Sequence, residues 1–121
     1  MESTFTITRW DETVLDETDP KLGRVQVGKT YAGSMAGTST GELTTCMAES
    51  GSGGYVGTEK FTGTLDGRTG SVVLQHGATM SPEGPVFFGH FVPGSGTDGL
   101  AGVSGTVRLE HERITVDHRF G

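Results

Sequence analysis

Residues 55–80, YVGTEKFTGTLDGRTGSVVLQHGATM, contain two runs of alternating residues on either side of Asp66-Gly67. Bulky apolar residues recur at every second position, which is the period of a β-strand that buries one face. Asp-Gly between two such runs is typical of a two-residue hairpin turn. The stretch therefore predicts two antiparallel strands joined by a tight turn.

The same pattern extends over the rest of the chain, and no apolar stripe with helical spacing is present. Glycine accounts for 21 of the 121 residues and separates the runs, as expected for many strands and turns. The acidic stretch 11–21, which contains Asp19-Pro20, is predicted to be a loop. The predicted strands are residues 3–10, 22–33, 37–49, 54–66, 69–80, 85–93, 100–110 and 113–120.

Short connections favour antiparallel neighbours, and eight strands of this length are enough to close a barrel. We therefore expect an all-β fold, a single antiparallel eight-stranded barrel formed by one domain over residues 1–121. A barrel of eight strands is either filled by side chains or wide enough for one small ligand.

Charge and composition argue against several classes of partner. The net charge is −6, and the nine basic residues are scattered, so neither nucleic acid nor an anionic membrane surface is an expected partner. The only cysteine, Cys46, excludes an intrachain disulfide. No apolar stretch is long enough to span a membrane, and the first residues do not resemble a signal peptide. We expect a cytoplasmic protein.

Residues 94–99, GSGTDG, have the G-x-G-x-x-G spacing of a dinucleotide-binding loop. Such a loop must lead into a helix whose N-terminal amides face the phosphates. Here the following residues alternate as in a strand, from Val103 through Val107 to Leu109. We interpret 94–99 as a turn and expect no cofactor.

Several polar residues fall among the apolar positions of their strands and are therefore expected to point inward. Glu59 shares a face with Tyr55 and Phe61, and His76 shares one with Leu74. By the same parity Trp10 lies on the face opposite to Phe5 and Ile7. The strands at 37–49 and 85–93 have apolar residues on both faces and cannot be assigned. The other polar residues placed inward are Arg9 with Phe5 and Ile7, Lys29 with Tyr31, and His118 with Ile114 and Val116.

Glu59 and His76 are the candidate catalytic residues. If the hairpin loop is Asp66-Gly67, Glu59 lies opposite Leu74 with His76 as its diagonal neighbour; if the loop is Gly67-Arg68, Glu59 faces His76 directly. A carboxylate and an imidazole in an apolar lumen are suited to general acid–base chemistry. The alternative is a buried ion pair in which Lys29 or His76 satisfies Glu59 and sets the strand register.

A metal site is not expected. His76, His118 and Glu59 lie on different strands, and the sequence has no pair of histidines at ligand spacing. The expected contacts for a ligand in the lumen are instead a set of inward-facing side chains from several strands: Lys29, Tyr31, Tyr55, Phe61, Leu74 and His118.

Three segments are RWDE at 9–12, residues 55–80, and VPGSGTDGLAGVSGT at 92–106. In the order and spacing of these segments, the chain resembles the bacterial domain-of-unknown-function family 3224. The resemblance implies an allene-oxide-cyclase-like barrel, an architecture shared with dirigent proteins and some spiro-forming Diels–Alder cyclases. It implies no particular activity and carries over no catalytic residues. Barrels of this kind assemble as dimers or trimers, so a homodimer or homotrimer is an expectation by analogy.

Three functions are compatible with this reading of the sequence. The leading hypothesis is a barrel that binds a small apolar or amphipathic molecule in its lumen. The first alternative is a cofactor-free cyclase or isomerase of the allene-oxide-cyclase or Diels–Alder type, which folds a flexible substrate and uses Glu59 to polarise a carbonyl or move a proton. The second alternative is a filled structural barrel that acts through oligomer contacts.

Overall fold

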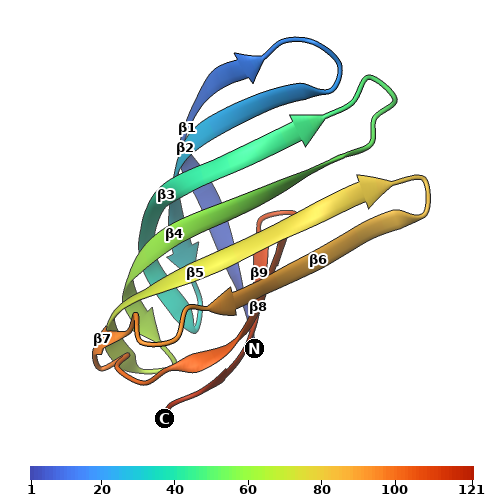
Figure 1. Ribbon diagram of the computed structural model, residues 1–121. Coiled ribbons are helices and arrows are strands. Elements are labelled where there is room, and N and C mark those ends of the chain that lie inside the picture. The colour runs from blue at the N-terminus through green and yellow to red at the C-terminus, as the bar shows by residue number, and fades with distance from the viewer.

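The computed structural model describes residues 1–121 and contains strands, turns and no helix (Figure 1). The all-β prediction is therefore confirmed. None of the chain forms a helix that could cross a membrane. The strands are β1 (Glu2–Asp16), β2 (Lys21–Ala32), β3 (Met35–Met47), β4 (Gly53–Leu65), β5 (Arg68–Ser81), β6 (Gly84–Phe91), β7 (Thr97–Asp98), β8 (Ser104–Glu110) and β9 (Arg113–Arg119).

The nine strands form one antiparallel sheet that returns on itself as a ring. Each of the strands β1 to β5 pairs with the strand that follows it in the chain. The ring is completed by the pairings of β6 with β8, β8 with β9, and β9 with β1. The two-residue β7 pairs only with the start of β5 and was not predicted from the sequence. Its brevity leaves no alternation to detect.

The two ends of the ring differ. The turns β1–β2, β3–β4 and β5–β6 project together at one end, the open end (Figure 1). The opposite half, which holds β7 and both chain termini, is the closed end. β9 pairs with β1 only at residues 2–4, and the β8–β9 turn meets β1 at Phe5. Beyond that point no strand connects β1 with β6.

The structure corrects the prediction of a loop at 11–21. β1 continues to Asp16 and pairs with β2 along its length, so the turn is confined to residues 17–20. The acidic side chains do not prevent the strand because they are exposed to solvent, while Thr13, Val14 and Leu15 are favourable strand residues. Charge was therefore a poor guide to a loop here.

A β-bulge in β1 corrects the predicted faces of Arg9 and Trp10. Ile7 pairs with Lys29, but Arg9 pairs with Gly28, so one extra residue is inserted between them. Trp10 then pairs with Val27 and lies on the inner face with Ile7, whereas Arg9 turns outward and donates to Gln26 at 2.7 Å. The bulge reverses the parity of the residues that follow it, up to a second register shift between Val14 and Asp16, and the alternation pattern did not reveal it.

The closed end is filled by apolar side chains. Among them Phe61, Met35, Leu65 and Leu100 are completely buried. Tyr31 packs between Phe5 and Phe61, with its ring centroid 5.8 Å and 5.4 Å from theirs. The whole cluster comprises Phe5, Tyr31, Met35, Phe61, Leu65, Val72, Leu74, Phe91, Leu100, Val103, Val107, Leu109, Ile114 and Val116.

Candidate functional site

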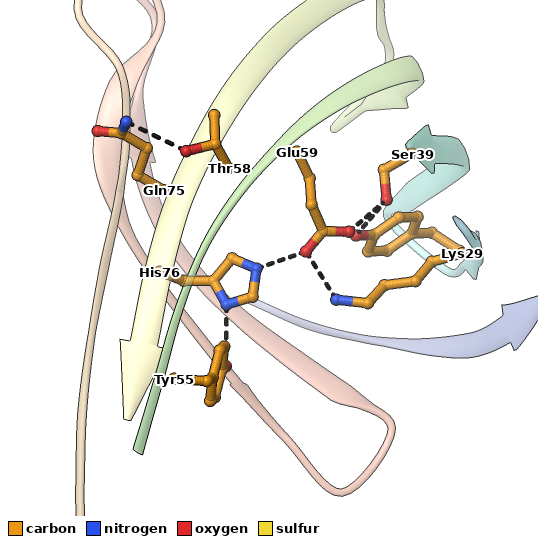
Figure 2. A network of polar contacts seen from close by, with 8 residues as sticks. Lys29, Ser39, Tyr55, Thr58, Glu59, Gln75 and His76 are labelled. Carbon is orange, nitrogen blue, oxygen red and sulfur yellow. Dashed lines mark hydrogen bonds and ion pairs between the residues drawn. The ribbon is translucent and has the colours of Figure 1, made fainter. Parts of the chain in front are cut away.

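Strand alternation brings three charged or titratable side chains together inside the ring. Lys29 on β2, Glu59 on β4 and His76 on β5 all point inward and are 5%, 0% and 2% exposed. Lys29 Nζ donates to Glu59 Oε2 at 2.8 Å, and His76 Nε2 contacts the same oxygen (Figure 2). The structure thus contains the buried ion pair that was the alternative interpretation of Glu59.

Two hydroxyl groups extend this network on either side. Ser39 on β3 donates to Glu59 Oε1 at 3.0 Å, and its oxygen lies 3.0 Å from the Tyr31 hydroxyl. On the other side the Tyr55 hydroxyl lies 2.9 Å from His76 Nδ1 (Figure 2). No buried side-chain nitrogen or oxygen lacks a hydrogen-bond partner, so every polar atom of the network has at least one partner.

A close approach of two strands makes room for the carboxylate. Gly41 on β3 pairs with Glu59, and a Cβ at Gly41 would lie 2.1 Å from the Thr58 carbonyl oxygen and 2.8 Å from Glu59 Cγ. Only a residue without a side chain fits between them. Glycine at this position therefore allows β3 to cover the buried carboxylate.

The surroundings of Glu59 keep it ionised. Burial by itself would raise the pKa of Glu59, but the hydrogen bond from His76 and the charge and hydrogen bond of Lys29 outweigh burial and hold the pKa at about 2. Burial lowers the pKa of Lys29, and the Glu59 carboxylate opposes that shift. Near neutral pH the centre of the network is therefore a carboxylate, which accepts hydrogen bonds and has no proton to donate.

The ionised carboxylate fixes the direction of the hydrogen bonds through His76. Because a carboxylate only accepts, Nε2 must carry the hydrogen that faces Glu59. Burial, followed by the nearby Glu59 charge, raises the pKa of Tyr55 to about 12, so Tyr55 is a phenol. With a neutral imidazole, the Tyr55 hydroxyl donates to Nδ1, and the order is hydroxyl, imidazole, carboxylate.

A pocket of about 730 Å³ opens directly above the network, toward the open end. Its wall is mainly apolar, and Lys29, Tyr55 and His76 lie at its floor. Polar residues occupy its rim: Glu12 and Lys21 from the β1–β2 hairpin, Glu110 at the end of β8, and His111 and Glu112 from the β8–β9 turn. The apolar lining includes Phe5, Ile7, Trp10, Val25, Leu43, Met47, Ala78, Met80, Pro85, Phe87 and Leu109.

The structure separates the predicted ligand contacts into two groups. Lys29 and Tyr55 line the pocket, as does the candidate catalytic residue His76, whereas Glu59 lies behind them and does not line it. The other predicted contacts do not line the pocket: Tyr31, Phe61 and Leu74 belong to the core of the closed end, and His118 faces Asp66 at 3.5 Å, next to Phe120, at that same end.

The register of the β4–β5 hairpin is the one with an Asp66-Gly67 loop. Glu59 pairs with Leu74, and Gly57 pairs with His76, so His76 is the diagonal neighbour of Glu59. In the last hairpin Gly105 faces His118. Asp66 adopts a φ of 49° and Gly67 a φ of 83°, the positive values that a two-residue hairpin turn requires.

Sequence reasoning missed Ser39 and the pocket residues from β1, β3 and β6. Ser39 lies on β3, where apolar residues on both faces hid the inward parity. Trp10 and Glu12 line the pocket only because the bulge in β1 turns them inward. No signal in a single sequence marks that bulge. Once the inward face of β3 was known, the polar side chain of Ser39 on that face would have indicated a hydrogen-bonding role inside the ring.

No group of three or more His, Cys, Asp or Glu side chains that could hold a metal ion occurs in the structure. The only inward cluster contains one carboxylate, and that carboxylate is already engaged by Lys29, Ser39 and His76.

The profile of the family described as "Protein of unknown function (DUF3224)" matches residues 1–120. The chain belongs to the DUF3224 family. The crystal structure of a protein of unknown function from this family, from Shewanella oneidensis, is similar to this DUF3224 chain with a TM-score of 0.79. The two sequences are 30% identical, and the similarity covers 98% of each chain. No curated protein matches the sequence.

Proposed function

We propose that this DUF3224 protein binds a small apolar or amphipathic molecule in the pocket at the open end. The observation that supports this most is the pocket itself, an apolar recess of about 730 Å³ with three convergent polar groups at its floor. Ligand sites commonly have volumes of ~300–1,000 Å³, apolar walls and a few placed polar groups. We further propose that the eight strands other than β7 form a barrel of the allene-oxide-cyclase type whose lumen holds the ligand.

The distribution of polar groups favours an amphipathic ligand with a defined orientation. An apolar body would pack against Val25, Leu43 and Phe87 on three different strands. A hydrogen-bonding head group would reach Lys29 and Tyr55 at the floor. A head group with oxygen acceptors suits this floor best, because the Lys29 ammonium only donates hydrogen bonds.

The pocket argues against a filled barrel that acts only through oligomer contacts. A filled lumen would leave room for no more than water, and a recess of about 730 Å³ is far larger than that. Large apolar side chains around the mouth, such as Trp10 at 51% exposed and Met80 at 52% exposed, gain their burial when a ligand enters.

Binding can be tested with a neutral fluorescent probe, N-phenyl-1-naphthylamine, and by native mass spectrometry of freshly purified protein. We expect the wild-type protein to bind the probe and Thr45→Phe, which fills the pocket from β3, to weaken binding at least tenfold. The matched control is Thr44→Phe, since Thr44 is the neighbouring residue, is exposed and does not line the pocket. Equal binding by the two variants, or no binding by the wild type, would contradict the proposal.

A further inference from the structure

A hydroxyl and an imidazole at the floor of the pocket are in series with a carboxylate behind them. The Tyr55 hydroxyl lies 2.9 Å from His76 Nδ1, and His76 Nε2 contacts Glu59 Oε2. Tyr55 and His76 line the pocket, whereas Glu59 is completely buried behind them. Figure 2 shows Tyr55, His76 and Glu59 following one another across strands β4 and β5.

This order is suited to moving a proton. When a base hydrogen-bonded to a hydroxyl accepts its proton, the hydroxyl oxygen can take another proton from a bound molecule. The carboxylate on the far side of the imidazole holds the ring in one tautomer and stabilises the imidazolium that forms. Glu59 is already ionised and in contact with Nε2, so it meets this requirement without rearrangement.

Lys29 places a positive charge beside the same site. Its Nζ donates to the Glu59 oxygen that His76 also contacts, so the ammonium and the imidazole lie next to each other. The ammonium has three hydrogens, and only one side-chain acceptor, Glu59, contacts it. Because Lys29 also lines the pocket, a further hydrogen is available to an oxygen of a bound molecule.

We propose that this site exchanges and relocates a proton next to a carbonyl group, so that its substrates are apolar, enolisable ketones or related carbonyl compounds. The inference rests on the proposed function, because the substrate must first bind in the pocket. Tyr55 takes the proton from the substrate, His76 is the base that receives the Tyr55 proton, and Glu59 is the positioning residue behind His76.

The step balances without a cofactor. The substrate C–H bond breaks, its proton passes to the Tyr55 oxygen, and the original Tyr55 proton passes to His76 Nδ1. The electron pair of the C–H bond becomes the enolate, whose oxygen accepts a hydrogen bond from Lys29 Nζ. Tyr55 and His76 line the open pocket, so the protons that they hold exchange with solvent before the transfers reverse. Return of a solvent-derived proton to the same carbon then gives exchange, and transfer to another carbon of the enolate gives an isomer or allows ring closure.

The test uses β-tetralone, an apolar ketone with acidic α-hydrogens, in deuterated buffer. Loss of the α-hydrogen signals is followed by NMR, and binding of the ketone is measured separately by saturation-transfer NMR. We expect the protein to accelerate exchange over buffer, and Tyr55→Phe and His76→Gln to lower the rate at saturating ketone by about 100-fold or more, the typical contribution of acid–base catalysis. The dissociation constant should change little, because both variants keep the shape of the wall.

The matched control is His90→Gln, since His90 lies on the outer face of β6 near Gln75 and does not line the pocket. This variant should exchange at the wild-type rate. Binding of the ketone without acceleration, or full acceleration in Tyr55→Phe, would overturn the proton-transfer proposal alone. Failure to bind the ketone while the fluorescent probe binds would also overturn it, whereas failure to bind either compound would overturn the proposed function.

Discussion

The closed and open ends of this molecule share strands β1 to β6, but only the closed end is filled. At the closed end β8 and β9 complete the ring, and Phe61, Leu65 and Leu100 are fully buried. At the open end β1 to β6 continue alone, and Trp10 and Met80 remain half exposed around a pocket. The difference follows from strand length: β8 and β9 have seven residues each, and β1 to β5 have twelve to fifteen.

The polar network lies at the boundary between the two ends. Along the inner face of β4, Tyr55 lines the pocket, Glu59 follows, and Phe61 begins the core. Stability and ligand chemistry therefore come from different parts of one strand. The comparison predicts that substitutions at the closed end cost stability, while substitutions at the open end mainly affect binding.

The largest expected effect compares one phenylalanine from each end. Phe61→Ala removes a completely buried ring from the core and should lower the free energy of unfolding by ~3–5 kcal/mol. Phe87→Ala removes a half-buried ring from the pocket wall and should cost less than about 1.5 kcal/mol while weakening probe binding. Urea denaturation of both variants measures the difference, and equal losses of stability would break the comparison.

A smaller effect is expected at the boundary, in the dependence of stability on pH. The pKa of Glu59 is about 2 in the folded protein, against an ordinary value of 4.5. As pH falls, the unfolded chain takes up this proton first, so the stability from Glu59 is complete above about pH 5 and is lost as pH approaches 2. The loss amounts to about 3 kcal/mol.

Urea denaturation at several pH values between 5 and 3 tests this prediction. Glu59→Gln should make the free energy of unfolding fall less steeply with falling pH than in the wild type. This slope is compared separately from the lower overall stability of the variant. Glu42→Gln, which removes an exposed carboxylate from β3, is the control and should decline as the wild type does. A Glu59→Gln variant with the wild-type slope would show that the buried pair does not couple protonation to folding.

The smallest expected effect concerns the rim of the open end. His111 and Glu112 form the β8–β9 turn with φ values of 48° and 63°, a conformation for which Asn and Gly are preferred. The double substitution His111→Asn with Glu112→Gly should raise the free energy of unfolding by about 1 kcal/mol. The expected result is a higher urea midpoint, with an unchanged slope of the free energy of unfolding against urea concentration. A lower midpoint would mean that the side chains of His111 and Glu112 stabilise the fold.

Residue alternation was enough to place Lys29, Glu59 and His76 on the inner face and to identify two possible registers for the β4–β5 hairpin. These predictions succeeded because each strand has one clearly apolar parity, and Asp66-Gly67 specifies a tight turn. Alternation failed for Arg9 and Trp10, since the inserted residue in β1 reverses parity without leaving a mark in composition.

The sequence by itself determined that the chain is all-β, where its eight longer strands lie and which side of most of them is buried, because these follow from local alternation and turn residues. Only the tertiary structure decided which inward residues form a core and which line a pocket. That division depends on where β8 and β9 end relative to β1 and β6 and on the bulge in β1. Both are relations between segments far apart in the chain, and they place Tyr55 and His76 beside open space but Tyr31 and Phe61 in the core.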